Sequence, residues 1–373
     1  MEVSLSGFRP EPEESFSKHW GFDSVRSAMA SAGSGQASDL RQFSSPRHNQ
    51  RQTSTCVAQS VIKAAEIKRI MKHGQDAHVD LSRLALYFLA RELMVPQETD
   101  RDAGTHVSLA ADAIRRFGVC RETSNGPEDK AFWPFDESLI MKPPPWLAMR
   151  EAYLNKIQSW YAIHGSGASR VEDAITALAA GNPVAYGTQV GSDWDGYDGR
   201  IIGVPTTSRG GHATCLVGWD PAGGFFWGEN SWGNDWGPYD GFNKISPDAV
   251  AASSSSDFIV ICAGYEPWVP KAALGEKHDQ ASVPDCTPYR FGGMPPVRTE
   301  PPEGHRRLSG RLRTPEGHEV SGGGRPSQRD HLQEVLRGYP KQRAFSQTFM
   351  RPQGEDVRRV QVNLPVEFSF LYY

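Results

Sequence analysis

A cysteine, a histidine and an amide side chain occur in this sequence in settings where together they could perform nucleophilic chemistry. Cys56 follows the polar run "NQRQTST" and begins the segment "CVAQSVIKAAEIKRIMK", whose small and apolar residues have helical spacing. The positive end of a helix favours the thiolate, which is the reactive form of cysteine. The position of Cys56 at a helix start therefore makes it a candidate nucleophile, although a lone cysteine is more often a packed apolar residue.

A thiol nucleophile needs a histidine that a third polar group holds in the right tautomer. The stretch "RGGHATCLVGWD" supplies His212 just before an apolar, β-prone run, and "FFWGENSWGNDWG" places Asn230 among aromatic residues. The amide oxygen of Asn230 could accept the imidazole N–H. Trp232 could cover that hydrogen bond and exclude water from it, which would strengthen it.

A tetrahedral intermediate would also need hydrogen-bond donors for its negative oxygen. The backbone N–H of Cys56 is one candidate, and the side-chain amide of Gln50, on the loop that leads into the helix, is another. Gln52 is closer in sequence and ranks second. Taken singly, these residues could be a buried cysteine, a strand histidine, a turn asparagine and a solvated glutamine, but their combination favours a catalytic role.

The elements that must position these residues fall into two groups. Helices are predicted over residues 56–73, 80–94, 106–118 and 171–181, with Asp80 or Ser82 as the cap of the second. Short β-prone runs follow at residues 183–190, 212–220, 224–231 and 257–265, separated by glycine-rich turns. Helices first and strands second predict an α+β fold with two subdomains. Residues 1–45 are expected to be irregular.

Composition limits the class of protein. With 373 residues, 38% hydrophobic residues and 23% charged residues, the chain can bury a sizeable core. A formal net charge of -4 gives no reason to expect nucleic acid as a partner, and no apolar run is long enough to span a membrane. The N-terminus does not have the pattern of a conventional signal peptide. Five widely spaced cysteines, without a CxxC pair, favour a reducing compartment and give no indication of a structural zinc site.

The last hundred residues differ from the rest. From about Trp268 the chain is rich in Pro, Gly and Arg, and it ends in "VRRVQVNLPVEFSFLYY", which alternates apolar and polar residues. We expect residues 268–373 to form an extended tail, whose β-prone end would seek a sheet edge or a protein partner. The expected location is therefore cytoplasmic, or within a larger assembly.

Together these residues resemble the papain-like cysteine peptidases over roughly residues 36–265. The family has a Gln six residues before the nucleophilic Cys, a long helix that this Cys opens, a later "GGHA" and then "NSWG". Here these are Gln50, Cys56, "GGHA" at 210–213 and "NSWG" at 230–233. The resemblance implies a two-lobe α+β fold, with a helical left lobe and an antiparallel β right lobe. It places a leader or cleft-covering segment at 1–35, the peptidase domain at 36–267 and the extended tail at 268–373.

The resemblance also implies roles for individual residues. Cys56, His212 and Asn230 would form the catalytic triad, and Gln50 would complete the oxyanion hole. Trp232 would shield the site, while Gly104 in "RDAGTHVS" and Gly211 would bind the substrate backbone. No metal or organic cofactor would be needed.

The chain departs from the family pattern at two positions beside the nucleophile. Val57 stands where an aromatic residue commonly follows the cysteine, and Thr53 stands where another cysteine often lies. The disulfide usual at that place therefore cannot form, which fits a reducing compartment and does not affect the chemistry. The segment before Cys56 is much shorter than the long inhibitory propeptide of many relatives, although residues 1–35 could still lie across the cleft.

The expected function is that of a cysteine peptidase that hydrolyses peptide bonds through an acyl-enzyme, with a peptide or protein as substrate. An alternative is a structural component of an assembly, such as a virion or a secretion apparatus, that docks through residues 268–373. A third hypothesis is acyl transfer by the same triad, as in a transglutaminase or an amidase.

Overall fold

The computed structural model describes residues 5–30, 36–262, 312–313 and 319–320. The chain divides into a unit of residues 1–288 with 366–373 and a unit of residues 289–365. In the second unit, β9 (Leu312–Arg313) pairs antiparallel with β10 (Glu319–Val320). The rest of the predicted tail, including its β-prone end, lies outside the described residues, and so does any surface through which it would dock. All the other helices and strands of the described residues belong to the first unit.

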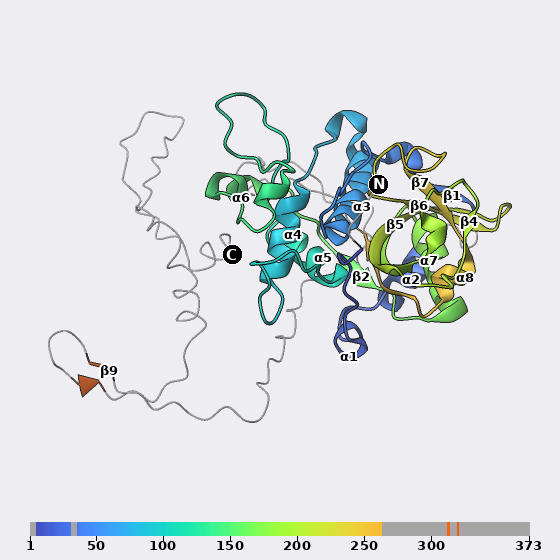
Figure 1. Cartoon of the computed structure of the whole chain (residues 1–373). Coiled ribbons are helices and arrows are strands. Elements are labelled where there is room, and N and C mark those ends of the chain that lie inside the picture. The colour runs from blue at the N-terminus through green and yellow to red at the C-terminus, as the bar shows by residue number, and fades with distance from the viewer. Residues whose placement is uncertain (1–4, 31–35, 263–311, 314–318, 321–373) are drawn as a thin grey trace, which may run out of the picture. The chain divides into compact units, whose positions relative to one another are not determined.

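One long helix, α3 (Cys56–His73), lies at the centre of this unit and is buried along most of its length. It begins at the predicted residue and ends at Gly74, whose φ of +86° only glycine adopts readily. Beside it pack α4 (Arg83–Glu92) and α5 (Val107–Arg116), and α6 (Trp146–Ala152) lies farther out on the same helical side of this unit (Figure 1). The Ser82 hydroxyl caps α4 by accepting the Ala85 N–H at 3.1 Å. Of the two predicted cap residues, Asp80 and Ser82, it is therefore Ser82 that caps the helix.

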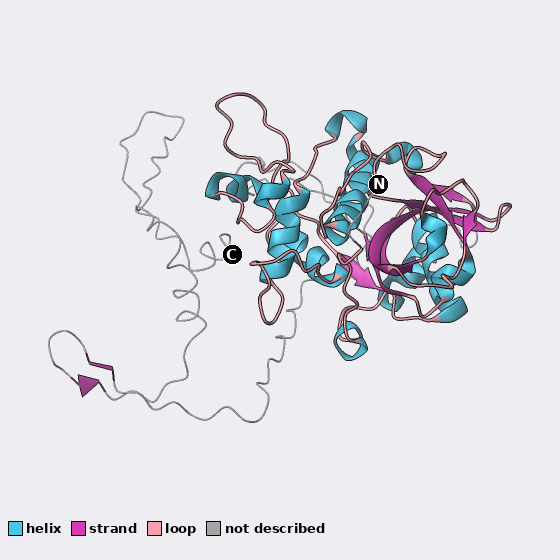
Figure 2. Ribbon diagram, in the orientation of Figure 1, coloured by secondary structure: helices cyan, strands magenta, loops and turns pink. Residues whose placement is uncertain are grey.

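An eight-stranded sheet forms the other side of the unit (Figure 2). Its order is β2-β8-β3-β5-β6-β7-β4, with β1 paired to β5, and every pairing is antiparallel except that of β4 with β7. The strands are β1 (Ser38–Asp39), β2 (Trp160–Ala162), β3 (Val184–Val190), β4 (Ile201–Ile202), β5 (Gly210–Asp220), β6 (Phe225–Glu229), β7 (Phe242–Ile245) and β8 (Ser255–Ile261). The predicted α+β fold is confirmed.

Two helices explain why the central strands are almost wholly apolar. Both β3 and β5 contact α3 and also α7 (Gly167–Ala179), which packs in turn on α8 (Pro247–Ala251). A strand covered on both faces buries consecutive residues instead of alternate ones, as β3 does along nearly all its length. This double cover holds the strand that carries His212 rigidly against the helix that carries Cys56.

The leader is more ordered than the sequence predicts. Its glycine- and proline-rich composition suggested an irregular segment, but it contains α1 (Glu13–Phe16) and α2 (Asp23–Ala30). Val25 and Met29 on α2 are buried, and the helix packs on α7. Tertiary packing of one apolar face therefore stabilises a helix whose sequence alone is weak evidence for it.

No helix in the described part of the chain has the length and apolar character needed to cross a membrane.

Candidate active site

The structure brings the three predicted catalytic side chains together. Cys56 is the first residue of α3, and the backbone N–H of Ala213 on β5 hydrogen-bonds its sulfur. The neighbouring His212 lies on β5, and Asn230 directly follows the adjacent strand β6. His212 Nε2 and Asn230 Oδ1 are 2.8 Å apart. The other imidazole nitrogen, Nδ1, has no hydrogen-bond partner among the described residues, so it is the nitrogen left for the thiol.

Burial keeps both reacting groups neutral in this structure. The Cys56 and His212 side chains are fully buried. Burial raises the pKa of the Cys56 thiol to about 12, although hydrogen bonds from the Ala213 and Val57 backbone act against it. Burial lowers the pKa of His212 to about 4, against the effect of the hydrogen bond that the imidazole donates to Asn230 Oδ1. A thiol and a neutral imidazole are therefore the stable pair here, and an ion pair needs a more solvated site.

The side chain of Gln50 is held rigidly beside the helix start. Its Oε1 accepts the Ser231 hydroxyl at 2.7 Å, and its Nε2 donates to the Thr53 carbonyl at 2.9 Å. Gln50 is fully buried, whereas the second candidate, Gln52, is exposed. A side-chain amide nitrogen carries two hydrogens and can donate two hydrogen bonds. The geometry therefore favours Gln50 over Gln52 as the oxyanion donor.

Aromatic rings cover the imidazole–amide pair. Trp232 is 5% exposed, and its ring centroid lies 5.0 Å from that of His212. Trp194 packs edge-on to His212 at 5.6 Å, and Trp236 donates from Nε1 to the Trp194 carbonyl at 3.1 Å. Sequence reasoning identified Trp232 and missed the other two tryptophans. The signal for Trp194 was the isolated tryptophan in "GSDWDG", a loop that otherwise looks merely acidic.

The N-terminus of the chain itself crosses the candidate site. The segment Leu5–Arg9 forms parallel β-bridges to Gly211 on one side and to Thr105 on the other. At Gly7 an added Cβ would come 2.5 Å from the Cys56 sulfur, so the backbone lies directly on the thiol. The Gly7 carbonyl accepts the Thr105 N–H at 3.0 Å. This segment fills the place that a substrate would need to reach Cys56.

Both glycines that were predicted to bind substrate backbone lie against this segment. A Cβ on Gly104 would collide with the carbonyl oxygens of Ser6 and Gly7, and one on Gly211 would come 2.6 Å from the Phe8 carbonyl. Gly104 also has a φ of +74°. At both positions glycine is needed because an extended backbone passes so close. Their role toward a true substrate stays a prediction.

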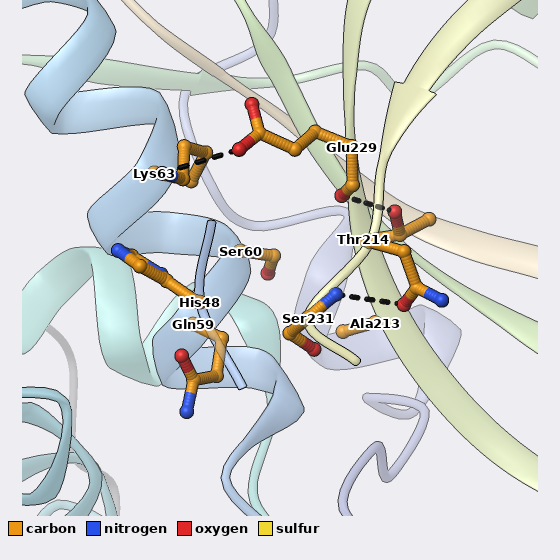
Figure 3. Close-up of a pocket in the computed structure, with 9 residues that line it drawn as sticks. His48, Gln59, Ser60, Lys63, Ala213, Thr214, Glu229 and Ser231 are labelled. Carbon is orange, nitrogen blue, oxygen red and sulfur yellow. Dashed lines mark hydrogen bonds and ion pairs between the residues drawn. The ribbon is translucent and has the colours of Figure 1, made fainter. Parts of the chain in front are cut away.

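A buried group of charged side chains joins α3 to β6 beneath the candidate site. Lys63 Nζ lies 3.1 Å from Glu229 Oε1, and both side chains are almost fully buried. Figure 3 shows this pair beside a small cavity of about 10 Å³, which is also lined by His48, Ser60 and Thr214. Because Glu229 immediately precedes Asn230, the ion pair ties the asparagine to the nucleophile's helix. Sequence reasoning missed it, since nothing local marks these charges as buried.

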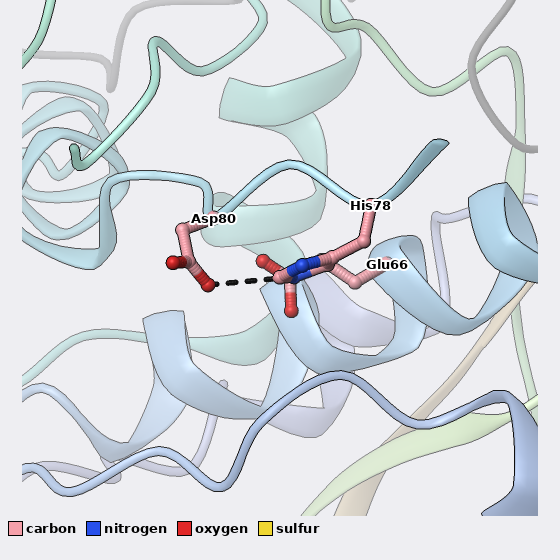
Figure 4. Close-up of side chains that lie close together, drawn as sticks. All are labelled: Glu66, His78 and Asp80. Atoms are coloured by element: carbon pink, nitrogen blue, oxygen red, sulfur yellow. Dashed lines mark ion pairs between the residues drawn. The ribbon is translucent and has the colours of Figure 1, made fainter. Parts of the chain in front are cut away.

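One group of side chains has the composition of a metal site. Glu66, His78 and Asp80 offer ligand atoms within 4.8 Å of one another (Figure 4). The Glu66 carboxylate, however, already accepts the Ser45 hydroxyl at 2.5 Å and the Leu81 N–H at 3.1 Å. His78 and Asp80 are also partly exposed. We assign no ion to this group.

The cysteines of the described residues carry no disulfide. Cys56, Cys120, Cys215 and Cys262 are all free and buried. Thr53, at the position where relatives often have a cysteine, instead hydrogen-bonds through its hydroxyl to the Gln50 carbonyl at 2.6 Å. The loop before the nucleophile is therefore held by hydrogen bonds where a disulfide would otherwise act.

Comparisons with known proteins identify the family and the fold of this chain. The family model described as papain family cysteine protease matches residues 35–258. An uncharacterised peptidase C1-like protein of Acanthamoeba polyphaga mimivirus is 27% identical over 217 residues, which cover 56% of this chain and 66% of that relative, just under two thirds. The crystal structure of xylellain, a cysteine protease from Xylella fastidiosa, has a similar fold, with a TM-score of 0.55 at 23% identity over 70% of this chain and 96% of that one. The match to the family model extends over more than half of the sequence, and the chain belongs to the papain family of cysteine proteases.

Proposed function

We propose that this chain hydrolyses peptide bonds in peptides or proteins through Cys56, His212 and Asn230. The observation that carries the proposal is the 2.8 Å hydrogen bond between His212 and Asn230, next to a cysteine at the start of α3. This bond orients the imidazole and leaves its Nδ1 available to take the thiol proton. We propose residues 36–267 as the peptidase domain.

The reaction would proceed in two stages. Cys56 passes its proton to His212 and its sulfur attacks the substrate carbonyl, while Gln50 and the Cys56 N–H bind the developing oxyanion. His212 then gives the proton to the leaving amine, and a thioester forms on the sulfur. In the second stage His212 takes a proton from water, the resulting hydroxide cleaves the thioester, and the proton returns to the sulfur as the acid leaves.

The N-terminal segment suggests what kind of side chain the site accepts. Phe8 is 4% exposed, and its ring fills a hollow against Gly187, where any Cβ would collide with it. A substrate that replaces the segment would put its own side chain there. We therefore propose a preference for an apolar side chain near the scissile bond.

The test is peptide hydrolysis by the full chain and by two alanine variants. Cys56→Ala removes the nucleophile and should reduce kcat/KM by at least about 10⁴-fold, without changing the fold by circular dichroism. Cys215→Ala is the matched control, because Cys215 is another fully buried cysteine and lies near the site. Its activity should stay close to that of the unaltered chain. Undiminished hydrolysis by Cys56→Ala would overturn the proposal.

A further inference from the structure

The segment that covers Cys56 is held more firmly beyond the site than over it. Over the nucleophile, Gly7 has no side chain, and the Ser6 hydroxyl lies 2.9 Å from the Ser54 hydroxyl. From Arg9 onward its contacts are charged. Arg9 Nη1 is 2.7 Å from Glu98 Oε2, and the next carboxylate of the segment is almost entirely buried. The charged contacts that hold the segment in place are therefore made by Arg9 and the residues after it.

That carboxylate, Glu11, is the principal anchor of the segment. Only 7% of its side chain is exposed. Its oxygens accept the hydroxyl groups of Ser108 on α5 and Ser15 on α1, each at 2.5 Å, and lie 3.1 Å from His19 Nε2. Glu11 therefore attaches the segment to α5 and to α1 of the leader. This point of attachment lies away from Cys56.

A second carboxyl group lies under the same anchor. Asp257 on β8 is 4% exposed, and its Oδ2 accepts the Glu11 backbone N–H at 2.8 Å. The charged and titratable groups that face it are Glu11 and His19 of the leader and Arg170 of α7, whose Nη1 donates to the Ser255 carbonyl. Two carboxyl groups therefore share one covered site, and the segment Leu5–Glu11 covers Asp257 as well as Cys56.

We propose that Leu5–Glu11 is a reversible cover of the active site, and that Glu11 and Asp257 form a latch that loosens as the pH rises from mildly acidic to alkaline. The inference rests on the proposed function only in treating Cys56 as the group that the cover controls. The Gly7 carbonyl accepts the Thr105 N–H at 3.0 Å, so closing the cover forms a backbone hydrogen bond that opening would break. Reversible opening, without cleavage of the segment, would then expose the site.

The direction of the pH effect follows from the two carboxyl groups. Burial, with the nearby charge of Glu11, raises the pKa of Asp257 from 3.8 to about 7. A raised pKa means that the closed form holds a proton that an exposed Asp257 gives up, so closure is favoured at low pH and lost as the pH rises to about 7. Burial alone would raise the pKa of Glu11, but its bonds to His19 and Ser108 lower it to about 2. Glu11 therefore stays charged across this range and weakens the latch only in strong acid.

Hydrogen exchange on the full chain tests the latch without relying on activity. The amide hydrogens of Arg9 and Thr105 join the segment to the site, and that of Glu11 joins it to Asp257. After correction for intrinsic rates, their protection should fall about tenfold or more between about pH 5.5 and about pH 8. Asp257→Asn keeps the acceptor and tolerates the φ of 55° at this position, but removes the titration. Its protection should change less than about twofold over the same range.

A second buried carboxyl group supplies the matched control. Asp173 is 3% exposed and pairs with Arg26, away from the segment, so Asp173→Asn should keep the full pH-dependent loss of protection. Equal protection of the unaltered chain at both pH values would overturn the proposal, and so would an equal fall in Asp257→Asn. A negative result in this experiment would not contradict the proposed function, because labelling or mutation of Cys56 tests that function separately.

Discussion

Two buried clusters of charged groups flank the candidate catalytic residues, and they differ in how their charges are balanced. Beneath the site, Glu229 lies between Lys63 at 3.1 Å and Arg47 at 2.9 Å, and Glu66 lies 3.9 Å from Lys63. At the N-terminal segment, in contrast, the carboxyl groups of Glu11 and Asp257 share one covered site whose facing basic side chains are His19 and Arg170.

The difference separates a structural cluster from a conditional one. A buried carboxylate that contacts cations directly is stable as an ion, and removing its partner is costly. At Asp257, burial next to the charge of Glu11 instead raises the pKa to about 7, so that its contact with the segment depends on pH. We infer that the Lys63 cluster holds the two sides of the site together under all ordinary conditions, whereas the Glu11–Asp257 pair lets the cover leave.

The largest effect is expected from removing the central cation of the first cluster. Lys63→Met would leave Glu229 without its closest contact to α3 and should lower the free energy of unfolding by about 3–5 kcal/mol. Urea unfolding followed by circular dichroism measures it. Lys68→Met, on the same helix, removes a lysine whose Nζ donates to the Gly181 carbonyl and to the Asn182 side-chain oxygen, and it should cost about 1 kcal/mol. Equal losses for the two variants would mean that the Lys63 cluster has no special role.

An effect of intermediate size is expected at Asp257, where the substitution should raise the free energy of unfolding instead of lowering it. Because its folded pKa of about 7 exceeds the ordinary 3.8, this group favours folding below about pH 4 and loses that contribution as the pH rises to about 7. Asp257→Asn should therefore be more stable than the unaltered chain at pH 8, by on the order of 1–3 kcal/mol, and should show a smaller loss of stability between about pH 4 and about pH 8. Thermal unfolding over this range would reveal it. Parallel pH profiles for the two proteins would contradict the assignment.

The smallest effect is expected at the exposed end of the segment. The Arg9 side chain is 38% exposed, so its ion pair with Glu98 is screened by water. Arg9→Ala should weaken the cover by less than about 1 kcal/mol, which is less than fivefold in the protection of the Thr105 amide. A larger loss would place the main anchor at Arg9 and not at Glu11.

How much of this could be predicted from the sequence depends on whether the signal is local. The start of α3 at Cys56, the cap Ser82 and the motifs around His212 and Asn230 each lie within a few residues, and the structure shows all of them in the expected elements. The contacts of Glu11 with Ser108 and Asp257 join residues about 100 and 250 positions apart, so no window of sequence contains them. The helix α2 was missed for a related reason, because its partner α7 is just as distant.

The most direct test of the central claim is labelling of the full chain with a peptidyl epoxide at about pH 8, with the adduct located by mass spectrometry. Such a reagent needs a reactive thiolate and an accessible substrate cleft together. We predict a single adduct on Cys56 that is lost in His212→Ala, although Cys120, Cys215 and Cys262 are also free thiols. An adduct on another cysteine, or labelling of Cys56 that persists in His212→Ala, would contradict the account.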